Sequence, residues 1–102
     1  MSAPLIFITG ASSGIGQALA AEYARRGWRL ALVARRVAEV ESWAAREGLA
    51  RERWEVYRAD VALPDSIVDA GAECIARQGL PDVVIANAGI SVGMDTAERE
   101  DL

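Results

Sequence analysis

The sequence predicts an α/β protein in which helices cover both faces of a doubly wound parallel sheet. Short apolar segments such as LIFIT (residues 5–9) resemble strands buried on both faces. Segments with helical periodicity alternate with them, and a glycine-rich turn follows the first strand segment. Strands separated by helices favour parallel pairing through right-handed crossovers.

Four strands are expected, and their order across the sheet should be third, second, first, fourth. They are the segments LIFIT (5–9), RLALVA (29–34), WEVYRA (54–59) and DVVIA (82–86). The sheet is expected to be cut off after the fourth strand, with residues from Thr96 onward as the first turn of another helix.

Three helices should connect these strands. The first runs from Ser13 to about Arg26, and a glycine follows it. The second begins near Val37 and ends at Gly48, and the third begins at Pro64 and ends at Gly79. In the first helix, one face is expected to pack inward through Ile15, Leu19 and Tyr23.

Composition restricts the organisation and the classes of function. The 102 residues, 52% of them hydrophobic, suit a single domain over 1–102. With no histidine and a single cysteine, Cys74, neither a disulfide within the chain nor a metal site is expected, and Cys74 should be a buried apolar residue, as should Tyr57. A net charge of −4 and no long basic run argue against nucleic acid as a partner.

The sequence also argues against a membrane partner. No apolar run is long enough to span a bilayer, and the amino-terminal residues MSAPLIFITG lack the features of a signal peptide. A cytoplasmic location is therefore expected.

The turn TGASSGIG (residues 9–16) predicts an anion site. Gly10 would permit the tight reversal, Gly14 would let backbone amides approach a ligand, and Gly16 would let the helix pack closely. A pyrophosphate would suit the positive end of that helix, with the Ser12 and Ser13 hydroxyls as further donors. Alternatively, the glycines only make a turn and Ser13 only caps the helix. The absence of lysine excludes a P-loop.

Three motifs together resemble those of the short-chain dehydrogenase/reductase family, classical type. They are TGASSGIG at 9–16, ADV at 59–61 and NAG at 87–89, in that family's order and spacing. The resemblance covers essentially the whole chain. It implies a Rossmann-like NAD(P)-binding fold and, in the parent protein, an oxidoreductase that transfers hydride between the cofactor and a small-molecule carbonyl or alcohol.

The resemblance also implies positions for the cofactor. Asp60 would accept a hydrogen bond from the adenine amino group, with Val61 beside the ring, although Asp60 alone could equally be turn chemistry. Asn87 would be partly structural, tying neighbouring strands together. The pyrophosphate and the adjoining ribose would lie on Gly10, Ser12, Ser13, Gly14, Ile15 and Gly16. The ribose nearer the nicotinamide would lie on Asn87, Ala88 and Gly89.

The end of the second strand predicts a preference for NADP(H) over NAD(H). An acid there would bind the ribose 2′-hydroxyl of NAD, whereas arginine accommodates the 2′-phosphate of NADP. This sequence has Arg35 and Arg36, and no acid before Glu39. Alternatively, these arginines only begin a solvated helix, although cations are unfavourable at a helix start and a phosphate would relieve that cost.

No catalytic residue is expected in this chain. The family uses a tyrosine followed four residues later by a lysine, but here Gly27 follows Tyr23 and Val61 follows Tyr57 at that spacing. The chain resembles the first half of a reductase, inactive alone, whose open fourth strand should cause self-association or pairing with the missing half. Two other functions stay open: a non-catalytic dinucleotide-binding or sensor module, and a structural fragment that binds nothing.

Overall fold

The structure, a computed structural model, describes residues 3–60 and 62–87. Helices and strands alternate as predicted, and strand bounds differ from the expected ones by at most one residue. The elements are β1 (Leu5–Thr9), α1 (Gly14–Arg25), β2 (Arg29–Ala34), α2 (Val37–Arg46), the 3₁₀ helix η1 (Arg51–Arg53), β3 (Trp54–Arg58), α3 (Pro64–Arg77) and β4 (Val83–Ala86). The sequence analysis did not anticipate η1. The glycines expected to end the helices, Gly27, Gly48 and Gly79, each have positive φ and follow a C-cap residue.

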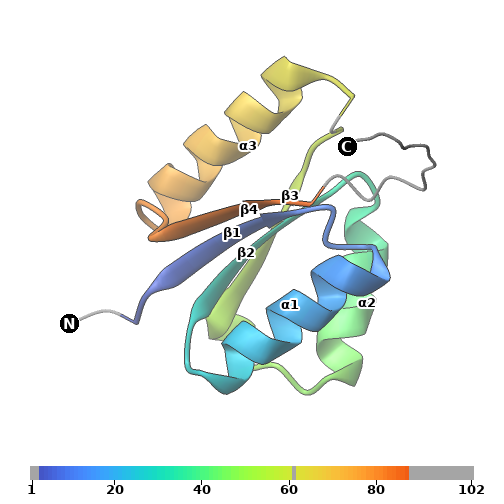
Figure 1. Cartoon of the computed structure of the whole chain (residues 1–102), viewed down its shortest axis with the longest axis vertical. Coiled ribbons are helices and arrows are strands. Elements are labelled where there is room, and N and C mark those ends of the chain that lie inside the picture. Colours follow the sequence, from blue (N-terminus) through green and yellow to red (C-terminus); the bar gives the residue numbers. More distant parts are fainter. Residues whose placement is uncertain (1–2, 61, 88–102) are drawn as a thin grey trace, which may run out of the picture.

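The four strands form one parallel sheet in the predicted order, β3-β2-β1-β4 (Figure 1). Ile6 of β1 lies opposite Leu30 of β2 on one side and Val83 of β4 on the other. All four strands therefore end at the same edge of the sheet.

Helices cover both faces of the sheet, with α1 and α2 on one face and α3 on the other (Figure 1). Ile6 and Ile8 belong to the core cluster on the α1 and α2 face, whereas Leu5 and Phe7 belong to the cluster on the α3 face. Because successive side chains point to opposite faces, a strand covered on both sides must be apolar throughout. This burial explains why β1 reads LIFIT.

The side chain of Gln78, the C-cap residue of α3, connects the end of that helix to the sheet through hydrogen bonds. The Tyr57 hydroxyl donates to Gln78 Oε1 (2.8 Å), and Gln78 Nε2 donates to the carbonyl of Leu30 (3.0 Å). Cys74 is fully buried nearby. Burial raises the pKa of both the Tyr57 hydroxyl and the Cys74 thiol above their ordinary values. The predictions that Tyr57 and Cys74 are packing residues are confirmed.

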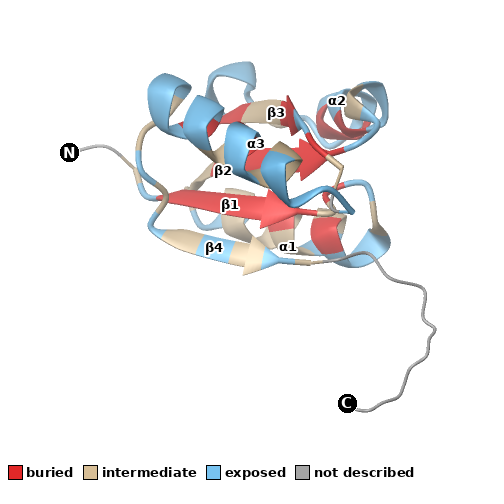
Figure 2. Ribbon diagram, turned by 90° about the horizontal axis from the view of Figure 1, so that it is seen from above, coloured by how far each residue is buried: buried red, intermediate tan, exposed pale blue. Residues whose placement is uncertain are grey.

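Among the described residues, β4 is an edge strand that pairs only with β1. Figure 2 shows β1 buried along its length and β4 half-buried to exposed. Val84 on β4 is 62% exposed. It lines a shallow apolar hollow of about 210 Å³ between β4 and α3, together with Phe7, Ile67, Gly71, Ile75 and Pro81.

Candidate functional site

The predicted site residues within the described ranges lie at the edge where the four strands end. Gly10 to Ser13 follow β1, Arg35 and Arg36 follow β2, Asp60 follows β3, and Asn87 follows β4. The chain passes from β1 to β2 on one side, and after β3 it crosses to β4 on the other side of β1, so the strand order reverses at β1. Ligands of doubly wound sheets bind at such a switch point.

Gly10 has the tight conformation that the sequence analysis assigned to it. Its φ is 67°, in the left-handed region. A Cβ atom at this position would overlap the backbone carbonyl of Asn87. The end of β1 and the end of β4 can approach this closely only because residue 10 has no side chain.

Gly16 and Gly14 differ in their surroundings. A Cβ atom on Gly16 would overlap the carbonyl oxygen of Gly10, so the first turn of α1 packs directly on the turn that precedes it. Close packing was predicted at Gly16, although its partner is this turn and not the sheet. A Cβ atom on Gly14 would meet no described atom within 4 Å. The packing of the fold therefore does not explain the glycine at 14.

Ser13 caps α1, as the structural alternative proposed. Its Oγ accepts a hydrogen bond from the Gly16 amide (3.0 Å) and donates to the carbonyl of Gly10 (2.9 Å). The single hydroxyl proton is thereby used. In this arrangement Ser13 directs its hydroxyl proton at Gly10, and donation from Ser13 to a bound anion stays a prediction. Ser12 is exposed.

Ile15 was predicted to lie on the inward face of the first helix, and this prediction is wrong. The residue was expected to pack inward with Leu19 and Tyr23, both of which do pack against the core cluster. Ile15 is instead 68% exposed. Among the described residues of α1, Gly16 and Ala20 are buried, whereas the side of the first turn that carries Ile15 faces outward. Its apolar side chain lies at the surface close to Gly14.

The turn also presents backbone donors. Within residues 3–60 and 62–87, the amides of Ser12, Gly14 and Ile15 donate to no protein acceptor. The neighbouring amides of Ala11, Ser13 and Gly16 are bonded to Val33 O, Gly10 O and Ser13 Oγ respectively. Unpaired amides at the positive end of a helix form a binding site for an anion. The 12-residue helix α1 supplies that positive end.

Asn87 ties β4 to the glycine turn. Its Nδ2 donates to Ser13 Oγ (2.8 Å) and to the carbonyl of Gly10 (3.3 Å). Its carbonyl accepts from the hydroxyl of Thr9 (3.3 Å). The structural half of the Asn87 prediction is confirmed. The sequence analysis missed Thr9, although it begins the glycine motif. Ala88 and Gly89 lie outside the described residues.

Asp60 takes part in turn chemistry, as the structural alternative held. Its Oδ1 accepts from the Ala62 amide (2.9 Å), and its own amide donates to Ser66 Oγ (3.0 Å). Its Oδ2 lies 4.0 Å from Nη1 of Arg35. The structure thus brings together two residues that were predicted to contact different parts of the cofactor, the adenine and the 2′-phosphate. Val61 lies outside the described residues.

Arg35 and Arg36 have different partners. Arg36 is the N-cap residue of α2 and pairs with Glu39 in the first turn of that helix (3.2 Å). This acid offsets the cost of a cation at the helix start, which supports the structural reading of Arg36. Arg35 is 67% exposed and pairs across the sheet edge with Asp60.

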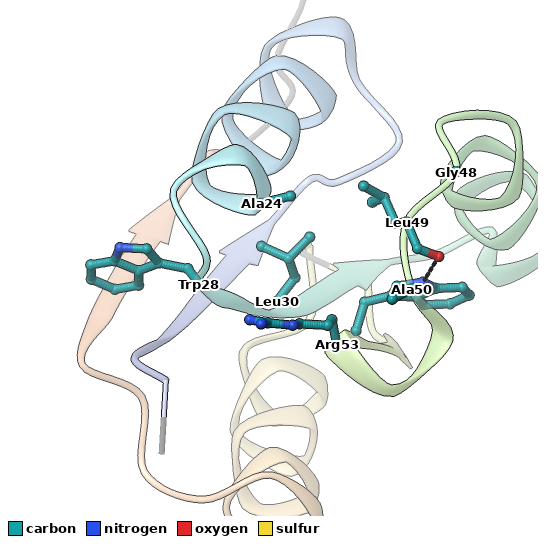
Figure 3. Close-up of a pocket in the computed structure, with 8 residues that line it drawn as sticks. Ala24, Trp28, Leu30, Gly48, Leu49, Ala50 and Arg53 are labelled. Carbon is teal, nitrogen blue, oxygen red and sulfur yellow. Dashed lines mark hydrogen bonds between the residues drawn. The ribbon is translucent and has the colours of Figure 1, made fainter. Parts of the chain in front are cut away.

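Another hollow, of about 270 Å³, lies at the opposite end of the sheet, where β2 and β3 begin (Figure 3). Leu30 near the start of β2 and Trp54 at the start of β3 belong to its wall. The Trp54 indole donates to the carbonyl of Leu49 (3.3 Å). No predicted site residue lines this hollow. Its lining consists of Ala24, Trp28, Leu30, Gly48, Leu49, Ala50, Arg53 and Trp54.

Comparison with known proteins defines the class. The family described as short chain dehydrogenase matches residues 4–101. The chain therefore belongs to the short chain dehydrogenase family of oxidoreductases. It is 39% identical over 99 residues to 11-beta-hydroxysteroid dehydrogenase A of Sesamum indicum, an alignment that covers 96% of this chain and 28% of that protein.

Solved structures agree with this assignment. An alcohol dehydrogenase from Thermococcus sibiricus, complexed with 5-hydroxy-NADP, is 34% identical with a TM-score of 0.73, over 81% of this chain and 36% of that chain. A metagenomic short-chain oxidoreductase in complex with NADP is 30% identical with a TM-score of 0.71, over 82% of this chain and 38% of that one. The chain thus spans well under half the length of these relatives. None of the described helices is long and apolar enough to cross a membrane.

Proposed function

We propose that this chain is the NADP(H)-binding portion of a short-chain oxidoreductase. The observation that carries the proposal is the set of unpaired amides of Ser12, Gly14 and Ile15 at the start of α1. Their arrangement fits a pyrophosphate, because the donors cluster at a helix N-terminus and no Cβ at residue 14 stands in the way. When bound, the cofactor would supply the hydride acceptor or donor.

Each part of this edge would have its own role toward the dinucleotide. The turn after β1 would hold the pyrophosphate, with Ile15 against an apolar part of the ligand. Asp60 would face the adenine, and Asn87 would keep the turn closed toward β4. In the parent protein, hydride would pass between NADP(H) and a small-molecule carbonyl or alcohol.

The preference for NADP(H) rests on the end of β2. Arg35 and Arg36 stand there, both largely exposed, with no acid before Glu39. Guanidinium groups offer permanently charged donors in a fork that matches a phosphate. Two similar solved structures hold NADP or an NADP derivative. Arg35 is the stronger of the two candidates, since Arg36 already pairs within its own helix.

We propose that the 102-residue chain binds the cofactor without turning over a substrate. It contains no lysine to assist a catalytic tyrosine. Tyr57 is the penultimate residue of β3, but its side chain is buried in the core on the α3 face and its hydroxyl is bonded to Gln78 at the end of α3. A non-catalytic dinucleotide-binding module is the second candidate, and for this chain it predicts the same binding.

Titration with both dinucleotides tests the proposal. NADPH and NADH are added separately to the full chain, and binding is followed by calorimetry. We expect saturable binding of both, with NADPH at least tenfold tighter because Arg35 meets the 2′-phosphate; tenfold is about 1.4 kcal/mol. The absence of binding would instead favour a structural fragment, and equal affinities would refute the NADP preference.

A further inference from the structure

Asp60 is held at the sheet edge with one carboxylate oxygen fixed. Its Oδ1 accepts from the Ala62 amide at 2.9 Å, and its backbone amide donates to Ser66 Oγ at 3.0 Å. These two bonds, one on the side chain and one on the backbone, restrict how the carboxylate can turn. The other oxygen, Oδ2, faces Nη1 of Arg35 at 4.0 Å.

The register of the sheet builds this juxtaposition. The amide of Ala59 donates to the carbonyl of Ala34 (3.1 Å), which holds the ends of β2 and β3 side by side. Arg35 and Asp60 are the next residues along each segment. The backbone thus places the two residues side by side, whereas Arg36 pairs locally with Glu39 on α2.

We propose that Asp60 is a positioning residue for Arg35, and that through it Asp60 raises the preference for NADP(H) over NAD(H). This inference rests on the proposed function. A guanidinium carries five N–H donors in one plane, so a contact at Nη1 leaves the other donors available for a 2′-phosphate. The anchored carboxylate thereby directs a long, 67% exposed side chain that would otherwise sample many rotamers.

The carboxylate also has an opposing effect, because a negative charge near the 2′-phosphate repels it. The two effects differ in sign for Asp60→Asn. Loss of positioning lowers the ratio of NADPH affinity to NADH affinity, whereas loss of repulsion raises it. An adenine contact by Asp60 affects both dinucleotides alike and cancels in this ratio. The sign of the change in the ratio therefore distinguishes positioning of Arg35 from repulsion of the 2′-phosphate.

The test is a double-mutant cycle in the full chain, with both affinities measured at one ionic strength. The variants are Asp60→Asn, Arg35→Ala and the pair together. Asparagine keeps an Oδ1 acceptor for the Ala62 amide, so the turn is retained. Asp65→Asn is the control, because it removes one nearby exposed charge from the first turn of α3 and has no contact with Arg35.

We expect Asp60→Asn to lower the NADPH to NADH affinity ratio about threefold to tenfold, within the range usual for coupled neighbours. In the Arg35→Ala background the same change should not lower the ratio, because only the repulsion of the 2′-phosphate is then removed, and Asp65→Asn should leave the ratio at the wild-type value. Circular dichroism confirms that each variant is folded.

Three results would overturn the inference. They are an unchanged or higher ratio in Asp60→Asn, an equal effect of Asp60→Asn with and without Arg35, and an equal effect of Asp65→Asn. If the wild-type chain prefers NADPH and one of these is found, only the inference fails. If the wild-type chain binds neither dinucleotide, the proposed function fails as well, and the inference fails with it.

Discussion

At the scale of single residues, two glycines in the first turn of α1 serve different ends. Gly16 has no room for a Cβ because the carbonyl of Gly10 occupies the space. Gly14 has open space around it and no positive φ. The fold therefore requires glycine at 16, whereas no described residue requires it at 14.

This contrast predicts opposite effects on stability. Gly16→Ala should lower the free energy of unfolding by about 1–3 kcal/mol, since the added methyl group forces the helix away from the turn. Gly14→Ala should leave it unchanged or slightly raised, because alanine is favoured over glycine in a helix. Urea denaturation of both variants measures the difference. Equal losses of stability at the two positions would contradict this account of the turn.

The conformation of the turn could be predicted from the sequence, whereas the side-chain contacts of the site residues could not. The glycine motif was sufficient to predict the tight turn and the start of α1, where the anion site is proposed, because helix termini and backbone conformation follow from local sequence. It could not decide how Ser13 uses its one proton, which depends on Gly10 and on Asn87 from a distant strand. Nor could periodicity show that Ile15 is exposed, because the spacing of apolar residues along a helix does not show which of its turns the core covers.

At the scale of elements, the strands were the most predictable part of the fold. Burial on both faces makes β1 and β2 apolar except at Thr9 and Arg29, and this pattern marks their bounds in the sequence. The short helix η1 was missed, because its three residues, RER, carry no periodicity. The edge position of β4 was predicted from its place as the fourth strand.

The open edge of β4 predicts association of the 102-residue chain. We propose that it self-associates, because β4 exposes Val84 beside an apolar hollow and pairs with no second strand in the described part of the chain. Analytical ultracentrifugation at micromolar concentration should show species larger than the 10.9 kDa monomer. Val84→Lys should shift the distribution toward monomer, because a charge on an edge strand disfavours pairing.

A matched control separates the strand edge from general hydrophobicity. Val68 on α3 is 67% exposed, a fraction similar to the 62% of Val84. It does not line the hollow. Val68→Lys should therefore leave association unchanged. A monomer in the wild-type chain, or equal effects of the two lysine variants, would argue against association through β4.

At the scale of the whole molecule, the parallel order brings together residues that are distant in sequence. Gly10, Arg35, Asp60 and Asn87 each follow a different strand and meet at one edge. The sequence predicted this meeting through the strand order. It did not predict the contact between Arg35 and Asp60, because side-chain pairs across an edge depend on register and rotamers.

The central claim is that the start of α1 binds the pyrophosphate of a dinucleotide. The most direct test is the NADPH affinity of Gly14→Ala, with Gly71→Ala as control, since a Cβ at Gly71 also meets nothing within 4 Å and the residue lies on α3. We predict at least a tenfold loss in Gly14→Ala, about 1.4 kcal/mol, and no change in Gly71→Ala. Wild-type affinity in Gly14→Ala would contradict the account.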